Sequence, residues 1–298
     1  MEQQSPLVTV VVPVYNSQFT LDRCLKSICA QTYRNLEILA VDDGSADASR
    51  QIIARWAAAD SRVRLIAKAN GGVSQCRNTG IRQAQGRFLQ FVDSDDRIPP
   101  SSTQTLVSQA LSRDCQLVVA DYYMVTGGKY MKNGSIQEPG LYTRRQFAQL
   151  MMRSPSDFYY GVMWNKLYCA DLVRRYDLAC PQEMNWGEDF FFNLEYLRYV
   201  DHVAVVKRAV YYYIRRKNSL SLSKNVILSA LPARMALFSR YKELYEGLDL
   251  YENNKLGISL YPLTFAHDAG YPIPREVAEA DAAGERPPRQ RGRGRLFP

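Results

Sequence analysis

Histidine is scarce in this sequence, and its cysteines form no close pairs. The chain of 298 residues has two histidines and six cysteines, and no two cysteines form a CxxC motif. Zinc sites and disulfide frameworks are both recognised by close, regular spacing of such residues. We therefore expect reduced thiols packed in the interior, and no structural zinc site.

Long apolar runs and a leader-like N-terminus are also missing. No apolar stretch approaches the roughly 18 residues that a membrane-spanning helix needs. The opening MEQQSPLVTVVVP has no basic flank before its apolar part, unlike a signal peptide. With 46% hydrophobic residues, the chain can bury a large core. The sequence therefore predicts a globular, cytoplasmic protein.

Two common glycine-rich phosphate loops are absent too. The sequence contains no GxxxxGK[ST] motif, and no GxGxxG follows its first predicted strand. This argues against a kinase-like P-loop and against a dinucleotide-binding site. A nucleotide phosphate would have to be met by a metal ion and by side chains.

The net charge of +8 comes largely from the end of the chain. Five arginines lie within residues 286–298, so the rest of the chain carries a charge near +3. The stretch GERPPRQRGRGRLFP is rich in Pro, Gly and Arg, and we predict a disordered basic tail over residues 271–298. Nucleic-acid binding is not expected, because the excess charge is confined to this tail.

Hydrophobic periodicity in the first hundred residues alternates between strands and helices. Each unbroken apolar run, typical of a strand buried on both faces, precedes a segment with helical spacing. The predicted strands lie in LVTVVVPVY, LEILAVDDGS, VRLIAKANGG and RFLQFVDSDD. This pattern predicts an α/β fold with a mostly parallel sheet flanked by helices.

Acidic and small residues gather where these strands end. PVYN, DDGS, NGG and DSDD follow the four strands in order. Ligands of open α/β sheets bind beyond the carboxyl ends of the strands. Crowded carboxylates repel one another unless a cation or hydrogen-bond donors lie among them. Oxygen ligands suit Mg²⁺ or Mn²⁺ with a substrate phosphate, although DDGS and DSDD are also ordinary turn and cap sequences.

Four motifs taken together resemble those of family 2 glycosyltransferases, the inverting GT-A enzymes that use nucleotide-sugar donors. They are VVVPVYN, VDDGSADAS, NGGVSQCRNTGI and GRFLQFVDSDD, in this order within residues 5–115. The resemblance implies a GT-A catalytic domain over residues 1–225, with a nucleotide-sugar-binding half (1–115) and an acceptor-binding half (116–225). A C-terminal helical region over residues 226–270 would follow it.

The resemblance also implies roles in the donor site. Asp43 would accept a hydrogen bond from the nucleobase. Asp93 and Asp95 would form a DxD element, with Asp93 toward the ribose and Asp95 toward a Mg²⁺ or Mn²⁺ ion on the diphosphate. Asp96 would be a structural neighbour. The other residues of the donor site would be Pro13, Tyr15, Asn70, Arg77, Ser94, Arg216 and Ser219.

WNKLY and NWGEDFFF resemble acceptor-side motifs of bacterial members of the same family. On that resemblance Asp189 is the general base, and Glu188 orients it or the acceptor. The residues expected to contact the acceptor are Trp164, Lys166 and Trp186. A helix predicted to begin at this point gives the two acids a second explanation, because carboxylates stabilise a helix N-terminus.

The resemblance implies transfer of a sugar, most simply a UDP-linked one, to a saccharide or lipid-linked saccharide in bacterial surface polysaccharide assembly. A metal would stabilise the leaving group while a carboxylate deprotonates the attacking hydroxyl. Two alternatives stay open: a nucleotide-sugar-binding protein without transferase activity, and another nucleotide-handling transferase. The helical spacing of residues 226–251 predicts either core packing or a helix on the inner face of the membrane. The sequence predicts no particular oligomeric state.

Overall fold

The computed structural model describes residues 5–155, 157–184, 187–215, 231–263 and 270–273. Four strand–helix units come first: β1 (Val8–Val14), α1 (Leu21–Cys29), β2 (Leu36–Asp42), α2 (Ser49–Ala59), β3 (Val63–Ala67), α3 (Gly72–Gln83), β4 (Phe88–Phe91) and α4 (Ser102–Ser112). The next elements are β5 (Leu117–Thr126), β6 (Lys129–Asn133), β7 (Gly140–Thr143), α5 (Arg144–Met151), α6 (Phe158–Gly161), β8 (Lys166–Cys169), α7 (Ala170–Arg175), α8 (Glu188–Leu197) and β9 (His202–Ile214). The last are α10 (Leu231–Glu246), α11 (Tyr251–Ser259), the short helix η2 (Tyr261–Leu263) and β10 (Gly270–Ile273).

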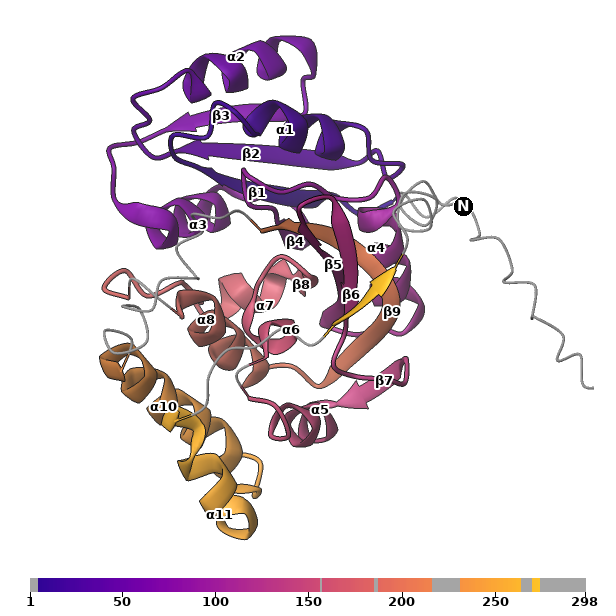
Figure 1. Cartoon of the computed structure of the whole chain (residues 1–298), viewed down its shortest axis with the longest axis vertical. Coiled ribbons are helices and arrows are strands. Elements are labelled where there is room, and N and C mark those ends of the chain that lie inside the picture. The colour runs from indigo at the N-terminus through magenta and orange to yellow at the C-terminus, as the bar shows by residue number, and fades with distance from the viewer. Residues whose placement is uncertain (1–4, 156, 185–186, 216–230, 264–269, 274–298) are drawn as a thin grey trace, which may run out of the picture.

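All ten strands of the described residues belong to one sheet (Figure 1). Its order is β10-β6-β5-β8-β4-β1-β2-β3, and β9 pairs with β5 and β7. The first four strands are mutually parallel, as predicted. Beyond β4 the sheet is mixed, because β8 runs antiparallel to both β4 and β5 while β9 runs parallel to β5. The predicted GT-A type of α/β sheet is confirmed, with its parallel part confined mainly to the first half.

Helices cover both faces of the parallel strands. Alternate side chains of a strand point to opposite faces, so Val10 and Val12 of β1 pack in the core beneath α1, α2 and α4, whereas Val11 packs with Ile81 of α3. Every residue of β1 and β2 is buried. This burial on two faces explains why these strands are unbroken apolar runs instead of alternating patterns.

The C-terminal helices pack against the second half of the molecule (Figure 1). Leu237, Tyr241 and Leu244 of α10 are buried in the same core as Phe190 of α8. Core packing therefore accounts for the apolar spacing of these side chains. No helix in the described part of the chain is long and apolar enough to cross a bilayer.

The predicted tail begins with a strand. Residues 270–273 form β10, which pairs antiparallel with β6. The prediction of disorder from residue 271 is therefore wrong at its start, because the open edge of β6 offers backbone groups for pairing. Residues 274–298 lie outside the described residues.

Candidate active site

Asp43 follows β2 and organises the loop before α3. Its buried carboxylate accepts hydrogen bonds from the backbone N–H of Gly71 (2.9 Å) and Gly72 (2.7 Å), and from Lys68 Nζ (2.5 Å). Asn70 donates to the Asp43 carbonyl (3.1 Å). Burial alone would raise the pKa of Asp43, but these donors lower it below its usual value. Asp43 and Asn70 thus meet at one sheet edge, and their contact with a nucleobase stays a prediction.

The loops after β1 and β4 meet at the same edge. Pro13 is buried within β1, whereas Tyr15, just beyond the strand, is 54% exposed. The hydroxyls of Ser17 and Ser94 lie 2.7 Å apart and share a hydrogen bond. The structure therefore brings Tyr15 and Ser94 to the edge where Asp43 lies, as the order of parallel strands predicts.

The DSDD segment is anchored by a tyrosine of β9. The buried Asp96 carboxylate accepts hydrogen bonds from Tyr211 Oη (2.9 Å) and from the Ile214 backbone N–H (2.7 Å). The same tyrosine oxygen accepts one from the Asp93 backbone N–H (3.1 Å). Asp96 is thus a structural residue, while Asp93 and Asp95 keep part of their surface exposed. Burial raises the pKa of Asp93, and the charge of Asp95 raises it further, against the lowering effect of the nearby Arg77.

The chemistry of this edge suits a hard cation. Asp93 and Asp95 offer only oxygen donors, which Mg²⁺ and Mn²⁺ prefer. The raised pKa of Asp93 reflects, after burial itself, carboxylate crowding that a cation would relieve. Among the described residues, no group of three or more His, Cys, Asp or Glu side chains is arranged to hold a metal ion. A Mg²⁺ ion bound mainly by substrate phosphates and water needs only one or two carboxylates.

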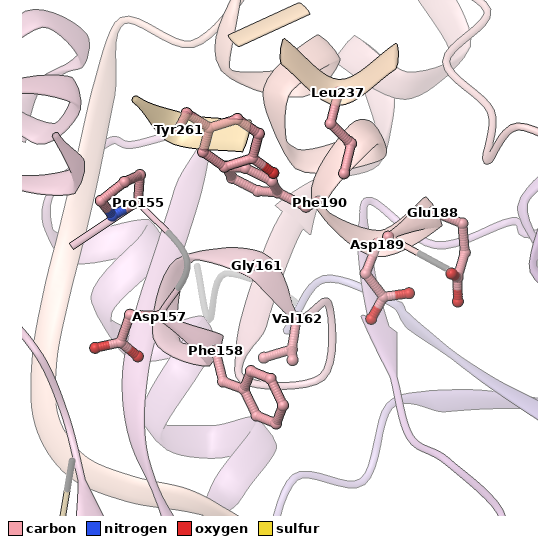
Figure 2. Close-up of a pocket in the computed structure, with 11 residues that line it drawn as sticks. Pro155, Asp157, Phe158, Gly161, Val162, Glu188, Asp189, Phe190, Leu237 and Tyr261 are labelled. Atoms are coloured by element: carbon pink, nitrogen blue, oxygen red, sulfur yellow. The ribbon is translucent and has the colours of Figure 1, made fainter. Parts of the chain in front are cut away.

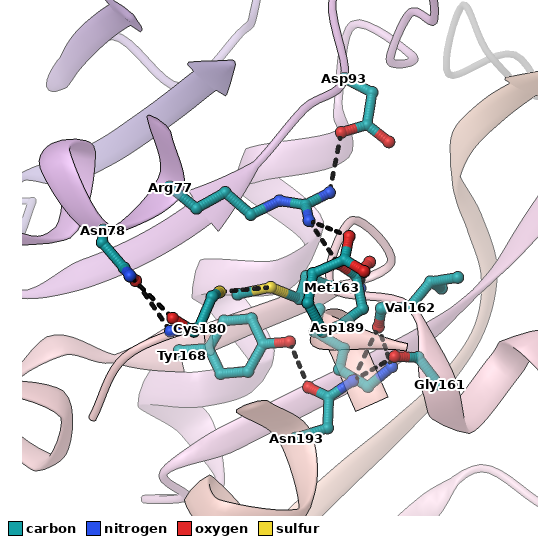
Figure 3. A network of polar contacts seen from close by, with 12 residues as sticks. Arg77, Asn78, Asp93, Gly161, Val162, Met163, Tyr168, Cys180, Asp189 and Asn193 are labelled. Atoms are coloured by element: carbon teal, nitrogen blue, oxygen red, sulfur yellow. Dashed lines mark hydrogen bonds and ion pairs between the residues drawn. The ribbon is translucent and has the colours of Figure 1, made fainter. Parts of the chain in front are cut away.

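Arg77 of α3 joins this edge to the second half of the molecule. Its guanidinium Nη1 lies 2.5 Å from Asp189 and 2.9 Å from Glu188, and Nη2 lies 3.3 Å from Asp93 (Figure 3). The Arg77 side chain is 5% exposed. One buried cation therefore holds carboxylates from two segments that lie far apart in the sequence, Asp93 in one and Glu188 with Asp189 in the other. The sequence predicted Arg77 near the nucleotide and did not reveal this bridge.

Asp189 lies in the first turn of α8, as predicted from the sequence. Its second carboxylate oxygen accepts a hydrogen bond from the Met163 backbone N–H (3.2 Å). Burial raises the pKa of Asp189 to about 7, and the charges of Glu188 and Asp93 add to this, while Arg77 opposes it. A carboxylate with a pKa near neutral can take up a proton from a substrate hydroxyl.

Asn193, one turn further along α8, fixes the loop that carries the Met163 amide. Its side-chain N–H₂ donates to the carbonyl oxygens of residues 160–162 at 3.1, 2.7 and 3.2 Å. Its oxygen accepts a hydrogen bond from Tyr168 Oη at 2.6 Å (Figure 3). Asn193 is not among the site residues predicted from the sequence. A signal was present, because an asparagine among the apolar residues of FFFNLEYL must find partners if it is buried.

Lys166 does not reach the acceptor side, contrary to the prediction. The side chain is buried, and Nζ donates to the carbonyls of Tyr159 (2.9 Å) and Val162 (2.5 Å) and to Asn165 Oδ1 (2.8 Å). Burial lowers the pKa of Lys166 to about 7. Lys166 therefore supports the same loop as Asn193.

Trp164 also packs in the interior and is not available to stack on a sugar ring. It is 3% exposed, and its ring stacks on Tyr211 at 4.3 Å and on Tyr213 at 5.6 Å between centroids. Because neighbouring rings cover it, the predicted contact with the acceptor is wrong. Three more predicted site residues lie outside the described part of the chain: Trp186, Arg216 and Ser219.

A cavity of about 210 Å³ opens beside Asp189 (Figure 2). Its walls come from the loop around α6, from the start of α8, and from α10 and η2. The lining residues are Pro155, Asp157, Phe158, Gly161, Val162, Gly187, Glu188, Asp189, Phe190, Leu237 and Tyr261. No local sequence pattern indicates that Leu237 and Tyr261, from the C-terminal helices, approach the candidate base.

Comparisons with known proteins find relatives of this sequence and solved structures with this fold. The sequence profile of Glycosyl transferase family 2 matches residues 9–176. The uncharacterized glycosyltransferase EpsJ of Bacillus subtilis is 30% identical over 72% of this chain, and the match spans 63% of EpsJ. TarS of S. aureus (residues 1–349, with UDP-GlcNAc) superposes with a TM-score of 0.66 at 21% identity, over 86% of this chain and 75% of that one. The mannosyltransferase PcManGT of Pyrobaculum calidifontis, with GDP-Man and Mn²⁺, has a TM-score of 0.58 at 17% identity, over 96% and 78%.

Proposed function

The chain belongs to glycosyl transferase family 2, and from this premise we propose that it transfers a sugar from a nucleotide-sugar donor to an acceptor hydroxyl. The donor is most simply a UDP-sugar, since TarS shares this fold and binds UDP-GlcNAc. The acceptor is a saccharide or lipid-linked saccharide of bacterial surface polysaccharide. The expected location is the cytoplasm or the inner face of the cell membrane.

One observation carries the proposal: a single guanidinium joins the candidate donor site to the candidate base. Asp93 contacts Nη2 of Arg77, and Asp189 contacts Nη1. A sugar whose diphosphate lies near Asp93 and Asp95 would therefore have its anomeric carbon within reach of an acceptor hydroxyl at Asp189. Reacting groups held in this way need no further rearrangement to meet.

The proposed reaction is a single displacement with inversion. The acceptor oxygen forms a bond to the anomeric carbon while the bond from that carbon to the diphosphate oxygen breaks, and the diphosphate leaves with the electron pair. The hydroxyl proton passes to the Asp189 carboxylate. A raised pKa of about 7 suits a base that must take this proton at neutral pH.

Asp95, beside Asp93, is the residue that would hold Mg²⁺ or Mn²⁺ in this scheme. When bound, such a cation neutralises charge on the leaving diphosphate. The Mn²⁺ complex of PcManGT supports this choice of ion. Asp93 itself is held by Arg77 and by the anchored DSDD segment, which suits a contact with the ribose.

Two substitutions test the proposal together. Asp189→Asn should lower transfer by at least about 10³-fold while UDP affinity is kept, because the carboxylate that accepts the proton is lost and the donor-side acids Asp93 and Asp95 stay in place. Asp95→Ala should instead abolish metal-dependent donor binding. Nucleoside diphosphate release reports transfer, and titration calorimetry with UDP and Mn²⁺ reports binding.

Asp201→Asn, an exposed acid outside the site, is the matched control and should change neither quantity. Unchanged transfer in Asp189→Asn would refute the assignment of the base. If the wild-type protein binds nucleotide sugars but never cleaves them, it is a binding protein without transferase activity.

A further inference from the structure

The cavity beside Asp189 has both apolar and acidic lining. Aromatic and aliphatic side chains, among them Phe158, Phe190 and Leu237, lie around it, and the Glu188 and Asp189 carboxylates lie together on one side (Figure 2). A pyranose matches both kinds of lining, because its C–H groups form an apolar face and its hydroxyls donate hydrogen bonds. A volume of about 210 Å³ is smaller than the roughly 300–1,000 Å³ of typical drug-sized sites. It therefore suits one sugar ring.

The charges around the cavity have a single sign. Asp157, Glu188 and Asp189 line it, and no lysine or arginine is among its described lining residues. Two nearby buried cations already have partners. Arg77 pairs with Glu188 and Asp189 of the lining and with Asp93. Lys166 Nζ donates to three oxygens of its own loop. Among the described lining residues, no cation would offset the repulsion that an anionic ligand meets here.

The C-terminal helices close this cavity. Leu237 of α10 lies against the start of α8 so closely that a Cβ atom on Gly187 would be 2.7 Å from Leu237 Cδ1. Tyr261 of η2 packs against Phe190, with ring centroids 5.8 Å apart. The apolar wall is therefore fixed to the same turn that holds Asp189.

We propose that this cavity is the subsite for the acceptor sugar, and that it selects an uncharged sugar over one that bears a carboxylate or phosphate. The inference rests on the proposed function, because it takes Asp189 to be the base that receives the hydroxyl proton. It adds the chemical class of the acceptor unit. It assigns the selection against anions to the lining carboxylates, and the seat of the sugar ring to the wall formed by Phe158, Phe190, Leu237 and Tyr261.

The experiment compares glycosides that differ only in charge. Phenyl β-glucoside and phenyl β-galactoside are titrated into protein with ¹³C-labelled Leu and Val methyl groups, and so are phenyl β-glucuronide and phenyl β-galacturonide. The neutral glycosides should shift the methyl signals of Val162 and Leu237 and bind at least about tenfold more tightly than the acids. Equal or tighter binding of an acid would overturn the inference, and so would the absence of any shift with both neutral glycosides.

Three variants locate the selection in the cavity. Phe158→Lys places a cation in the lining at a partly exposed position, and it should remove or reverse the preference for neutral glycosides. Phe158→Leu changes the same side chain without charge and should keep the preference. Leu256→Lys adds a cation at an 86% exposed position of α11, outside the lining, and should also keep it. A preference that is the same in all three variants would overturn the assignment to this cavity.

Donor use is measured separately, by UDP titration and by UDP-sugar cleavage. If the protein neither binds nor cleaves nucleotide sugars yet still prefers neutral glycosides, the proposed function fails and the sugar-binding cavity stands. If the protein cleaves UDP-sugars but transfers preferentially to acidic acceptors, the proposed function stands and the cavity inference fails.

Discussion

The two halves of the proposed catalytic domain, residues 1–115 and 116–225, hold their candidate site residues in different ways. They are called the donor half and the acceptor half after their proposed roles. In the donor half, Asp43 and Asp93 directly follow parallel strands, and Asp43 is held by the N–H groups of a nearby loop. In the acceptor half, Asp189 depends on partners that are distant in sequence, Arg77 and the Met163 amide. A site made by strand ends is fixed by the sheet itself. A site made by long-range contacts should be far more sensitive to the loss of one of them.

Arg77→Met should have the largest effect, because it removes the ion pairs that join Asp93 to Glu188 and Asp189. Three carboxylates would then face one another without a cation. We expect transfer to fall by at least about 10³-fold and stability by about 3 kcal/mol. The lower end of the usual range applies because Asp93, Glu188 and Asp189 keep 15–28% of their side-chain surface exposed. Nucleotide release and urea unfolding measure the two effects.

Arg82→Met is the control for this variant. Arg82 lies on the same helix but is exposed, so both effects should be small. If Arg77→Met transfers sugar as well as Arg82→Met does, the bridge does not hold the base.

Local sequence patterns predict the donor half well, for a physical reason. An apolar strand followed by acids has one placement in a parallel sheet, so the positions of Asp43 and Asp93 at a common edge follow from the chain itself. The predicted helix at Glu188 is confirmed as well. Contacts that join distant segments carry no local pattern. For that reason the motif around Trp164 and Lys166 predicts acceptor contacts, although both side chains are buried and support the fold.

The pH dependence of sugar transfer should report on Asp189 in the acceptor half, separately from donor binding. Transfer should fall about tenfold per pH unit below about 7, because the raised pKa of Asp189 leaves the base protonated there. A rate profile with UDP-sugar and acceptor checks this, and UDP affinity measured over the same range corrects for donor binding. A rate that is level from pH 7 down to 5 would contradict Asp189 as the titrating base.

Stability should respond to pH with opposite signs in the two halves. The pKa of Asp189 is raised in the folded protein, so its contribution is fully present below about pH 4 and is lost as the pH rises through about 7. The pKa of Asp43 is lowered, so its contribution is present above about pH 4 and is lost at lower pH. Urea unfolding of Asp189→Asn and Asp43→Asn beside the wild type should show the two opposite slopes.

Replacing Asn193 in the acceptor half should cost more stability than replacing Asn70 in the donor half, although both effects are smaller than that of Arg77→Met. Asn193→Leu leaves the carbonyls of residues 160–162 and the Tyr168 hydroxyl short of partners in a buried site. It should cost about 2 kcal/mol and about tenfold in transfer, with UDP affinity unchanged. Asn70→Leu, in the exposed donor-half loop, should cost less than about 0.5 kcal/mol. If both variants lose the same free energy of unfolding, the hydrogen bonds of Asn193 do not stabilise the loop that carries the Met163 amide.

Two glycines give the finest comparison, because both adopt the left-handed conformation. Gly72 has φ +86° and Gly187 has φ +82°, so alanine at either position should cost about 1 kcal/mol from backbone strain. Nothing lies within 4 Å of a Cβ at Gly72, whereas a Cβ at Gly187 would lie 2.7 Å from Leu237 Cδ1. Gly187→Ala should therefore cost about 1–3 kcal/mol more in urea unfolding than Gly72→Ala. It should also weaken the binding of neutral glycosides, because Leu237 must move in the cavity wall.

In the double variant Gly187→Ala/Leu237→Ala the added clash is relieved, so the cost of the glycine substitution should drop to that seen at Gly72. If Gly187→Ala costs the same stability with and without the Leu237 side chain, backbone strain in the turn before α8, and not contact with α10, explains the need for glycine at this position.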